Sequence, residues 1–176
     1  VRGGVALHAS KLWAFVQRVQ QAELQAFGAR LHDYKKELKG SKLLDKDRFK
    51  WAAQTPDLSP EDRQRHSRGF LTKGLEKKSP TRLEFTAYGQ ASLVMARLVF
   101  DALRAFDARI FSSVIPANVV KPETYVAQDF LRKDHVFLLE RYFYFLEKQN
   151  QHGLLVMDEV EKVSDRRFVR QMDRYF

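Results

Sequence analysis

Two acidic segments contain the residues best placed to do chemistry. Asp158 and Glu159 directly follow the apolar run 154–157 in LLVMDE, and Glu37 lies in KELKGSKLL just before a Gly and a Ser. Four consecutive apolar residues are typical of a central strand buried on both faces, and α/β sheets bind ligands outside the carboxyl ends of such strands. A carboxylate held there is a suitable ligand for a hard divalent cation.

Both segments also have a purely structural interpretation. The chain needs polar residues where it leaves a core, and an acidic pair before a helix is favoured by the helix dipole. Glu37 is surrounded by four lysines at positions 35, 36, 39 and 42, so it is expected to be a solvated ion-pair partner. The same lysines would suit phosphate contacts if Glu37 faced a metal ion. Taken one at a time, the two segments favour the structural interpretation and leave the functional one open.

Other chemistries have less support in the sequence. The chain has no cysteine, which excludes a disulfide framework, a thiolate nucleophile and a cysteine-ligated metal site. Its five histidines are scattered and none forms an HxxxH pair. The sequence also lacks GxSxG, GxGxxG and the phosphate-binding loop GxxxxGK followed by Ser or Thr, so it gives no support to a serine hydrolase or a nucleotide-binding fold.

The charge balance favours a polyanionic partner. The sequence has 31 basic and 22 acidic residues, a formal net charge of +9, which makes nucleic acid the expected partner. Aromatic residues Phe49, Trp51 and Phe70 lie among the basic stretches, where they would either stack on unpaired bases or anchor loops to the core. The candidate phosphate contacts are Lys39, Lys42, Arg63 and Arg68.

The expected secondary structure alternates between strands and helices. Apolar residues at helical spacing predict helices over residues 11–27, about 86–106 and about 130–149, and Ser164 is expected to open a last helix. Strands are expected over Gly3, Gly4 and the VAL of residues 5–7, weakly in RLHDYKK, and at residues 154–157. ARIFSSVIP is expected to be a buried strand that ends at Pro116, and the alternative there is more helix. This order predicts an α/β fold, a sheet with helices packed on its faces.

The 176 residues are expected to form one domain. Residues 54–80 contain three of the five prolines and many charges, which favours a charged insertion or mobile connector, with a short helix starting at Ser59. No apolar stretch approaches the roughly 20 residues of a spanning helix, so no membrane association is expected. The absence of cysteine favours a reducing, cytoplasmic location. The abrupt starts and ends, VRGGVAL and RYF, suggest that the domain is incomplete at both ends.

Five segments taken together resemble a known family. VRGGVALHASKLW, KELKGSKLL, DALRAFDARIFSSVI, FLRKDHVFLLER and GLLVMDE, in this order, are similar to the bacterial and archaeal family of domain of unknown function 3800. The resemblance spans most of the chain. It implies a ribonuclease H-like mixed sheet flanked by helices, and metal-dependent cleavage or joining of nucleic-acid strands.

The resemblance also implies roles for particular residues. Glu37 and Asp158 match two of the family's acidic positions and would be catalytic ligands of Mg²⁺ or Mn²⁺, accompanied by Glu159. Two further family aspartates lie in segments that this sequence does not contain, although two-metal chemistry needs about three or four carboxylates. The expectation is therefore a metal-dependent nuclease acting on phosphodiesters. The alternative is a non-catalytic module of the same fold that binds nucleic acid or protein.

Overall fold

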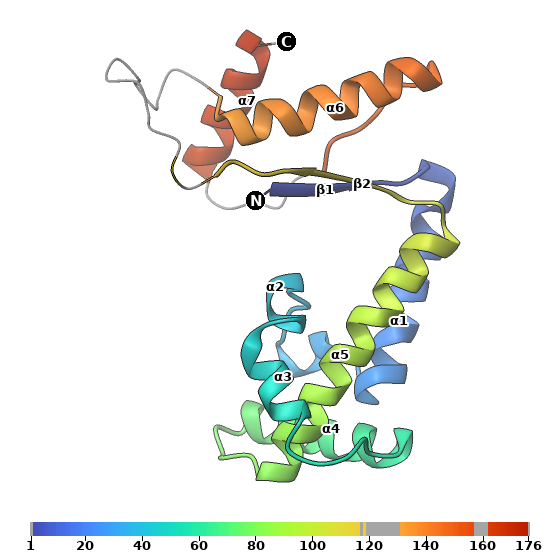
Figure 1. Cartoon of the computed structure of the whole chain (residues 1–176), viewed down its shortest axis with the longest axis vertical. Helices are drawn as coiled ribbons and strands as arrows, with labels where there is room; N and C mark the ends of the chain where they lie inside the picture. Colours follow the sequence, from blue (N-terminus) through green and yellow to red (C-terminus); the bar gives the residue numbers. More distant parts are fainter. Residues whose placement is uncertain (1, 117, 119–130, 157–161, 176) are drawn as a thin grey trace. The chain divides into compact units, whose positions relative to one another are not determined.

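The computed structural model describes residues 2–116, 118, 131–156 and 162–175 (Figure 1). Its contacts divide the chain into two compact units. Residues 7–108 form one, called here the helical unit, and residues 1–6 with 109–176 form the other, called the ribbon unit.

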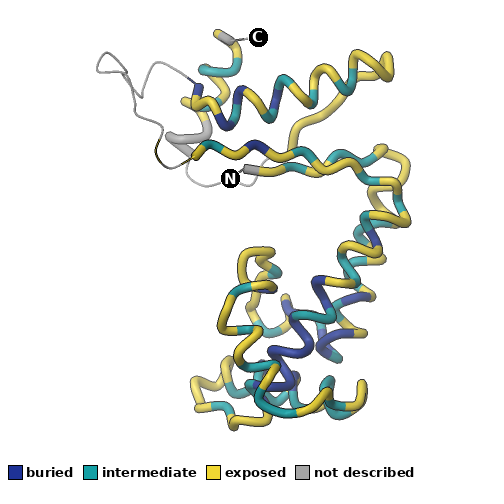
Figure 2. Tube along the Cα trace, in the orientation of Figure 1, coloured by how far each residue is buried: buried dark blue, intermediate teal, exposed yellow. Residues whose placement is uncertain are grey.

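The helical unit is built around one long helix, α5 (Arg82–Ala105). Helices α1 (Leu12–Phe27), α3 (Lys46–Ala52) and α4 (Pro60–Leu75) all pack against α5. The unit also contains α2 (Gly40–Leu43) and two 3₁₀ turns, η1 (Ala9–Lys11) and η2 (Leu31–Tyr34). Phe27, Leu71 and Met95 are fully buried at the centre of the unit, where Figure 2 shows the buried stretches of its helices in dark blue.

Local capping signals explain where these helices begin and end. Gly28 ends α1 in the left-handed conformation, with φ 69°, which glycine adopts without steric cost. Ser59 caps α4 by accepting a hydrogen bond from the Asp62 amide, and Pro60 occupies the first turn. Thr81 and Glu84 form a capping box at the start of α5.

The ribbon unit combines two strands with two helices. Strand β1 (Arg2–Ala6) pairs antiparallel with β2 (Arg109–Ser113), and the register places Ala6 opposite Arg109. Helix α6 (Lys133–Gln149) packs on the strands. The ring of Phe111 in β2 makes edge-to-face contacts with the rings of Tyr142 and Phe145 in α6. Helix α7 (Lys162–Tyr175) contributes two side chains, Phe168 and Met172, to the small apolar cluster around Leu131, Val136 and Leu139.

The predicted α/β fold is wrong. Most of the described residues are helical. The described part of the chain has one sheet of two antiparallel strands, not a ribonuclease H-like mixed sheet flanked by helices. The weak strand expected in RLHDYKK is the 3₁₀ turn η2, because Lys35 takes the left-handed conformation and its amide closes the turn on the carbonyls of His32 and Leu31. Residues 154–156 pair with no strand among the described residues, and Leu154 and Val156 are 84% and 86% exposed.

Several local predictions are confirmed. Helices α1, α5, α6 and α7 lie close to their predicted ranges, and β1 and β2 are strands. The helix predicted to start at Ser59 is present as α4. It was expected to be short and to lie in a connector outside the core, but it extends to Leu75 and its Leu71 is fully buried in the core. Strand β2 is less buried than expected, since Ile110 is 59% exposed. Within the described ranges, no helix has the length and apolarity needed to cross a membrane.

Candidate nucleic-acid interface

Glu37 lies on the surface of the helical unit, between η2 and α2. Its Oε2 atom is 3.1 Å from Lys39 Nζ, and its side chain is 67% exposed. This is the solvated ion pair that the structural interpretation of KELKGSKLL predicts. No group of three or more His, Asp or Glu side chains that would hold a metal ion is found in the described part of the chain.

Asp158 and Glu159 lie outside the described residues. The apolar residues before them, Leu154 to Val156, belong to the ribbon unit, whereas Glu37 belongs to the helical unit. A metal site shared by Glu37 and Asp158 therefore stays a prediction.

The four predicted phosphate contacts divide between two parts of the helical unit. Lys39 and Lys42 are exposed at α2, where Lys42 Nζ is 3.7 Å from Asp45 Oδ2. Arg63 and Arg68 lie on α4, where Arg63 has a buried Nε and Arg68 donates a hydrogen bond of 3.5 Å to the carbonyl of Gly28. Arg63 is half-buried, whereas Arg68 is exposed like the two lysines.

Helix α3 presents a basic and aromatic face to solvent. Lys46, Phe49 and Lys50 are spaced i, i+3, i+4, so they share one side of the helix. All three are exposed, with Phe49 at 51%, and neither lysine has an ion pair among the residues described. Hereafter the Lys46–Phe49–Lys50 surface is called the α3 face.

The start of α3 is fixed by Asp45. Its Oδ1 atom accepts hydrogen bonds from the backbone amides of Asp47, at 2.9 Å, and Arg48, at 3.1 Å. The hydrogen bond from Arg48 and the neighbouring positive charges outweigh desolvation and hold the pKa of the Asp45 carboxyl below its usual range. The cap therefore stays ionised at neutral pH and positions the first turn that carries Lys46.

The opposite side of α3 is anchored to α5. The Arg48 guanidinium lies 4.4 Å from the ring centroid of Trp51 and 4.7 Å from that of Tyr88, and Arg48 Nε donates to the carbonyl of Lys42. A Cβ added at Gly89 of α5 would lie 2.7 Å from the Ala52 amide nitrogen and 2.9 Å from the Arg48 carbonyl oxygen. Because α5 has only a hydrogen at this point, the two helix backbones come into close contact and α3 is held firmly.

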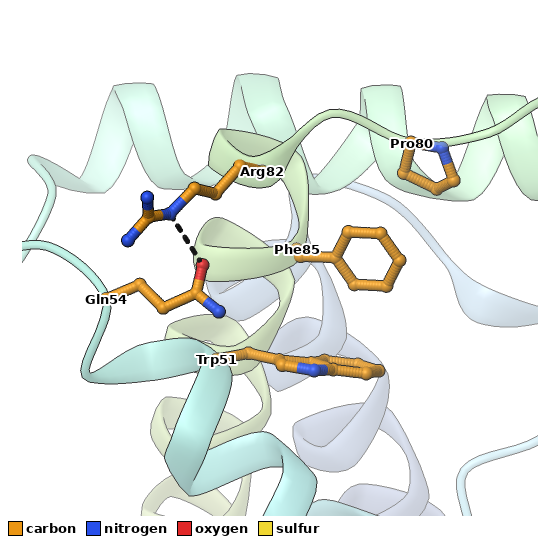
Figure 3. Close-up of a pocket in the computed structure, with 5 residues that line it drawn as sticks. All are labelled: Trp51, Gln54, Pro80, Arg82 and Phe85. Carbon is orange, nitrogen blue, oxygen red and sulfur yellow. Dashed lines mark hydrogen bonds between the residues drawn. The ribbon is translucent and has the colours of Figure 1, made fainter.

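An open pocket lies at the carboxyl end of α3. It has a volume of about 380 Å³, and Figure 3 shows the five side chains that line it, Trp51, Gln54, Pro80, Arg82 and Phe85. Gln54 Oε1 accepts a hydrogen bond from Arg82 Nε at 3.2 Å. Thr86 Oγ1 lies 3.4 Å from the same oxygen and donates more closely, at 3.1 Å, to the Arg82 carbonyl. The indole of Trp51 and the ring of Phe85 meet edge to face with centroids 4.8 Å apart.

Sequence reasoning pointed to part of this basic and aromatic surface and missed the rest. It selected the lysine-rich region and named Phe49 and Trp51 as residues that would stack on bases or anchor loops. Phe49 is exposed on the α3 face, whereas Trp51 packs against Phe85 and Arg48. An Asp45 cap followed by a helical KDRFK pattern would have predicted the α3 face, but no local signal brings Arg82 and Phe85 next to Gln54.

The chain was also compared with known proteins. No protein-family model, no curated protein and no solved structure matches it.

Proposed function

We propose that this protein binds single-stranded nucleic acid through the α3 face. The observation that carries the proposal is the arrangement of Lys46, Phe49 and Lys50, two exposed cations on either side of an exposed aromatic ring on one side of a helix. Proteins that bind single strands combine cationic side chains that follow the phosphates with aromatic side chains on which bases stack. The α3 face has both groups.

The charge around α3 supports the same proposal. Lys35, Lys36, Lys39 and Lys42 precede α3. Within the described part of the chain, only the last two have ion pairs, Lys39 with Glu37 and Lys42 with Asp45. Lys35 and Lys36 are exposed. The formal charge of +9 for the whole sequence gives a field that attracts phosphates.

A single strand fits this surface better than a duplex does. In a duplex the base faces are stacked on one another, so an exposed Phe49 would have no ring to contact. In a single strand the faces are accessible, and stacking on an aromatic side chain is worth about 1–3 kcal/mol per base.

The test is the salt dependence of oligonucleotide binding. Fluorescence anisotropy of labelled oligothymidylate and oligouridylate, measured at several salt concentrations, is expected to show affinity that falls as salt rises, by a slope of about 0.7 for each phosphate contact. Replacing both Lys46 and Lys50 by Gln removes two contacts and is expected to reduce the slope by about 1.4. Phe49→Ala is expected to lower the affinity with little change in slope.

A matched control separates the α3 face from general charge. Arg97 and Arg104 are exposed cations of α5, and the Arg97→Gln, Arg104→Gln variant has the same net charge as the lysine variant. It is expected to keep nearly the full slope. Equal losses in both double variants would mean that the protein attracts nucleic acid by net charge alone, which contradicts the proposal.

Metal-dependent hydrolysis of the bound strand, which the family resemblance implies, is a further proposal. It is supported by the exposure of Glu37 beside lysines suited to phosphate. Calorimetric titration with Mn²⁺ tests it on the parent chain, Glu37→Gln and Asp158→Asn. Saturable binding in the parent that both variants lose is the expected result, and binding that neither substitution weakens would contradict these two ligands.

A further inference from the structure

We infer that the pocket at the end of α3 accepts one unpaired base of the strand that lies on the α3 face. This inference rests on the proposed function and adds to it a site where a base is held by its ring and by its polar edge. The pocket is formed by Trp51 and Gln54 on the α3 side and by Pro80, Arg82 and Phe85 at the start of α5.

One side of the pocket is apolar and fixed. Figure 3 shows the rings of Trp51, Phe85 and Pro80 along this side, with Gln54 and Arg82 across from them. Phe85 is held edge to face by Trp51 at 4.8 Å and by Phe70 at 5.2 Å, and Trp51 is held further by the Arg48 guanidinium. These contacts restrict the rings before any ligand binds, which lowers the entropic cost of stacking a flat ligand on them.

The other side of the pocket offers hydrogen-bond donors. Gln54 Oε1 already accepts from Arg82 Nε, so the amide group Nε2 remains as a donor. Among the described residues, neither Gln54 Nε2 nor the two terminal nitrogens of Arg82 has an acceptor. A matching ligand therefore has a flat ring and acceptor oxygens or nitrogens on its edge, which is the chemistry of a nucleobase.

The pocket also lies where a strand bound on α3 would reach it. Lys46 and Lys50 are about 6 Å apart along the helix axis. Trp51 directly follows Lys50, and Gln54 comes just after the helix ends. The volume of about 380 Å³ is at the small end of the range for ligand pockets, which is enough for one base.

The experiment compares a strand with bases and a strand without them on the full chain. The sequence has two tryptophans, and Trp13 is 68% exposed, so Trp13→Phe leaves Trp51 as the fluorescent reporter of the pocket. Titration with oligothymidylate is expected to quench Trp51 and to give an affinity about tenfold higher than an abasic oligonucleotide of the same length. The abasic strand is expected to bind by its phosphates without the quenching.

Gln54→Glu tests the polar side of the pocket. The carboxylate still accepts from Arg82, but it replaces the Nε2 donor by a negative acceptor that repels the base edge. The variant is expected to lose about tenfold in affinity for oligothymidylate and to lose the quenching. Gln21→Glu, at an exposed position of α1, makes the same charge change outside the pocket and is expected to alter the binding of both strands equally and slightly.

The possible results separate this inference from the proposed function. Equal affinities of the parent for the two strands, unchanged by Gln54→Glu, would overturn the base pocket and leave the α3 face in place. Absence of binding to either strand would overturn the proposed function and the pocket with it. If thymidine monophosphate quenched Trp51 at the same concentration as the oligonucleotide, the pocket would belong to a free nucleotide, and the assignment to a bound strand would be overturned.

Discussion

At the scale of single residues, the buried carboxylate of Glu84 joins α4 to α5. Its Oε2 atom accepts hydrogen bonds from the Thr81 amide at 2.6 Å and from Lys73 Nζ at 2.8 Å, and the residue is only 8% exposed. Burial favours the neutral acid, but the hydrogen bonds from Lys73 and Thr81 outweigh it and lower the pKa of Glu84 below its ordinary value of 4.5. The carboxylate is therefore ionised when the protein is folded at neutral pH.

This lowered pKa predicts a loss of stability in acid. A depressed folded-state pKa adds stability above the unfolded-state value, and that stability is lost as the pH falls from about 4.5 through the folded-state pKa. Glu84→Gln is expected to lower the free energy of unfolding by about 1–3 kcal/mol at pH 7. Between pH 5 and 3, the free energy of unfolding of this variant is expected to fall less than that of the parent protein. Urea unfolding at each pH measures both effects.

Glu61 provides the control for this prediction. It lies in the first turn of α4 and is exposed, so Glu61→Gln is expected to change the free energy of unfolding by less than about 0.5 kcal/mol. If the free energy of unfolding fell equally with pH in the parent and in Glu84→Gln, the loss of stability in acid would not come from Glu84.

At the scale of elements, the close approach of α3 to α5 depends on Gly89. An added Cβ would lie within 3 Å of two backbone atoms of α3, so Gly89→Ala is expected to push the helices apart at a cost of about 1–3 kcal/mol. The emission of Trp51 is expected to change as well, because α3 carries it. Urea unfolding and tryptophan fluorescence of the Trp13→Phe background measure the two effects.

Gly74 of α4 is the matched control. A Cβ there has no neighbour within 4 Å, so Gly74→Ala is expected to leave stability unchanged or to raise it by up to about 1 kcal/mol through helix propensity. If the two alanine variants had equal stability, the close helix contact at Gly89 would not be the constraint that the structure indicates.

Helices were predictable from the sequence because their signals are local. The spacing of apolar residues in α1, the Gly28 end signal and the Ser59 start signal all act within a few residues. Strands depend on partners far away in the chain, and the apolar run at Leu154 indicated burial without supplying a partner. The α/β prediction failed at this step, since two of the four expected strands, in RLHDYKK and at residues 154–156, are not strands in the described chain.

The interface shows the same limit. Lysines and an exposed aromatic residue are a property of one short segment, so the region of α3 was predictable. The pocket requires Trp51 to meet Phe85 and Gln54 to meet Arg82, contacts that exist only after α3 packs on α5. Neither composition nor periodicity contains that information.

At the scale of the whole molecule, the two units differ in how much core they have. The helical unit buries Phe27, Leu71 and Met95 completely, whereas the apolar cluster of the ribbon unit has three buried residues among those that the structure describes. Native-state hydrogen exchange is expected to show this difference, with the β1–β2 amides opening at a lower free energy than the amides of α5 around Met95. Equal protection in both would instead indicate one cooperative unit, as the single-domain prediction expects.

The pairing of Ala6 with Arg109 imposes an order on folding. Strand β1 precedes the helical unit in the chain and β2 follows it. Pairing of the two strands therefore closes a very long loop, and the entropic cost of loop closure grows with loop length. Folding of the helical unit shortens that loop, because Lys11 Nζ then bonds to the Phe106 carbonyl and Phe15 meets Phe106 near the two ends of the unit. During synthesis, β1 is therefore expected to pair with β2 only after the helices have assembled.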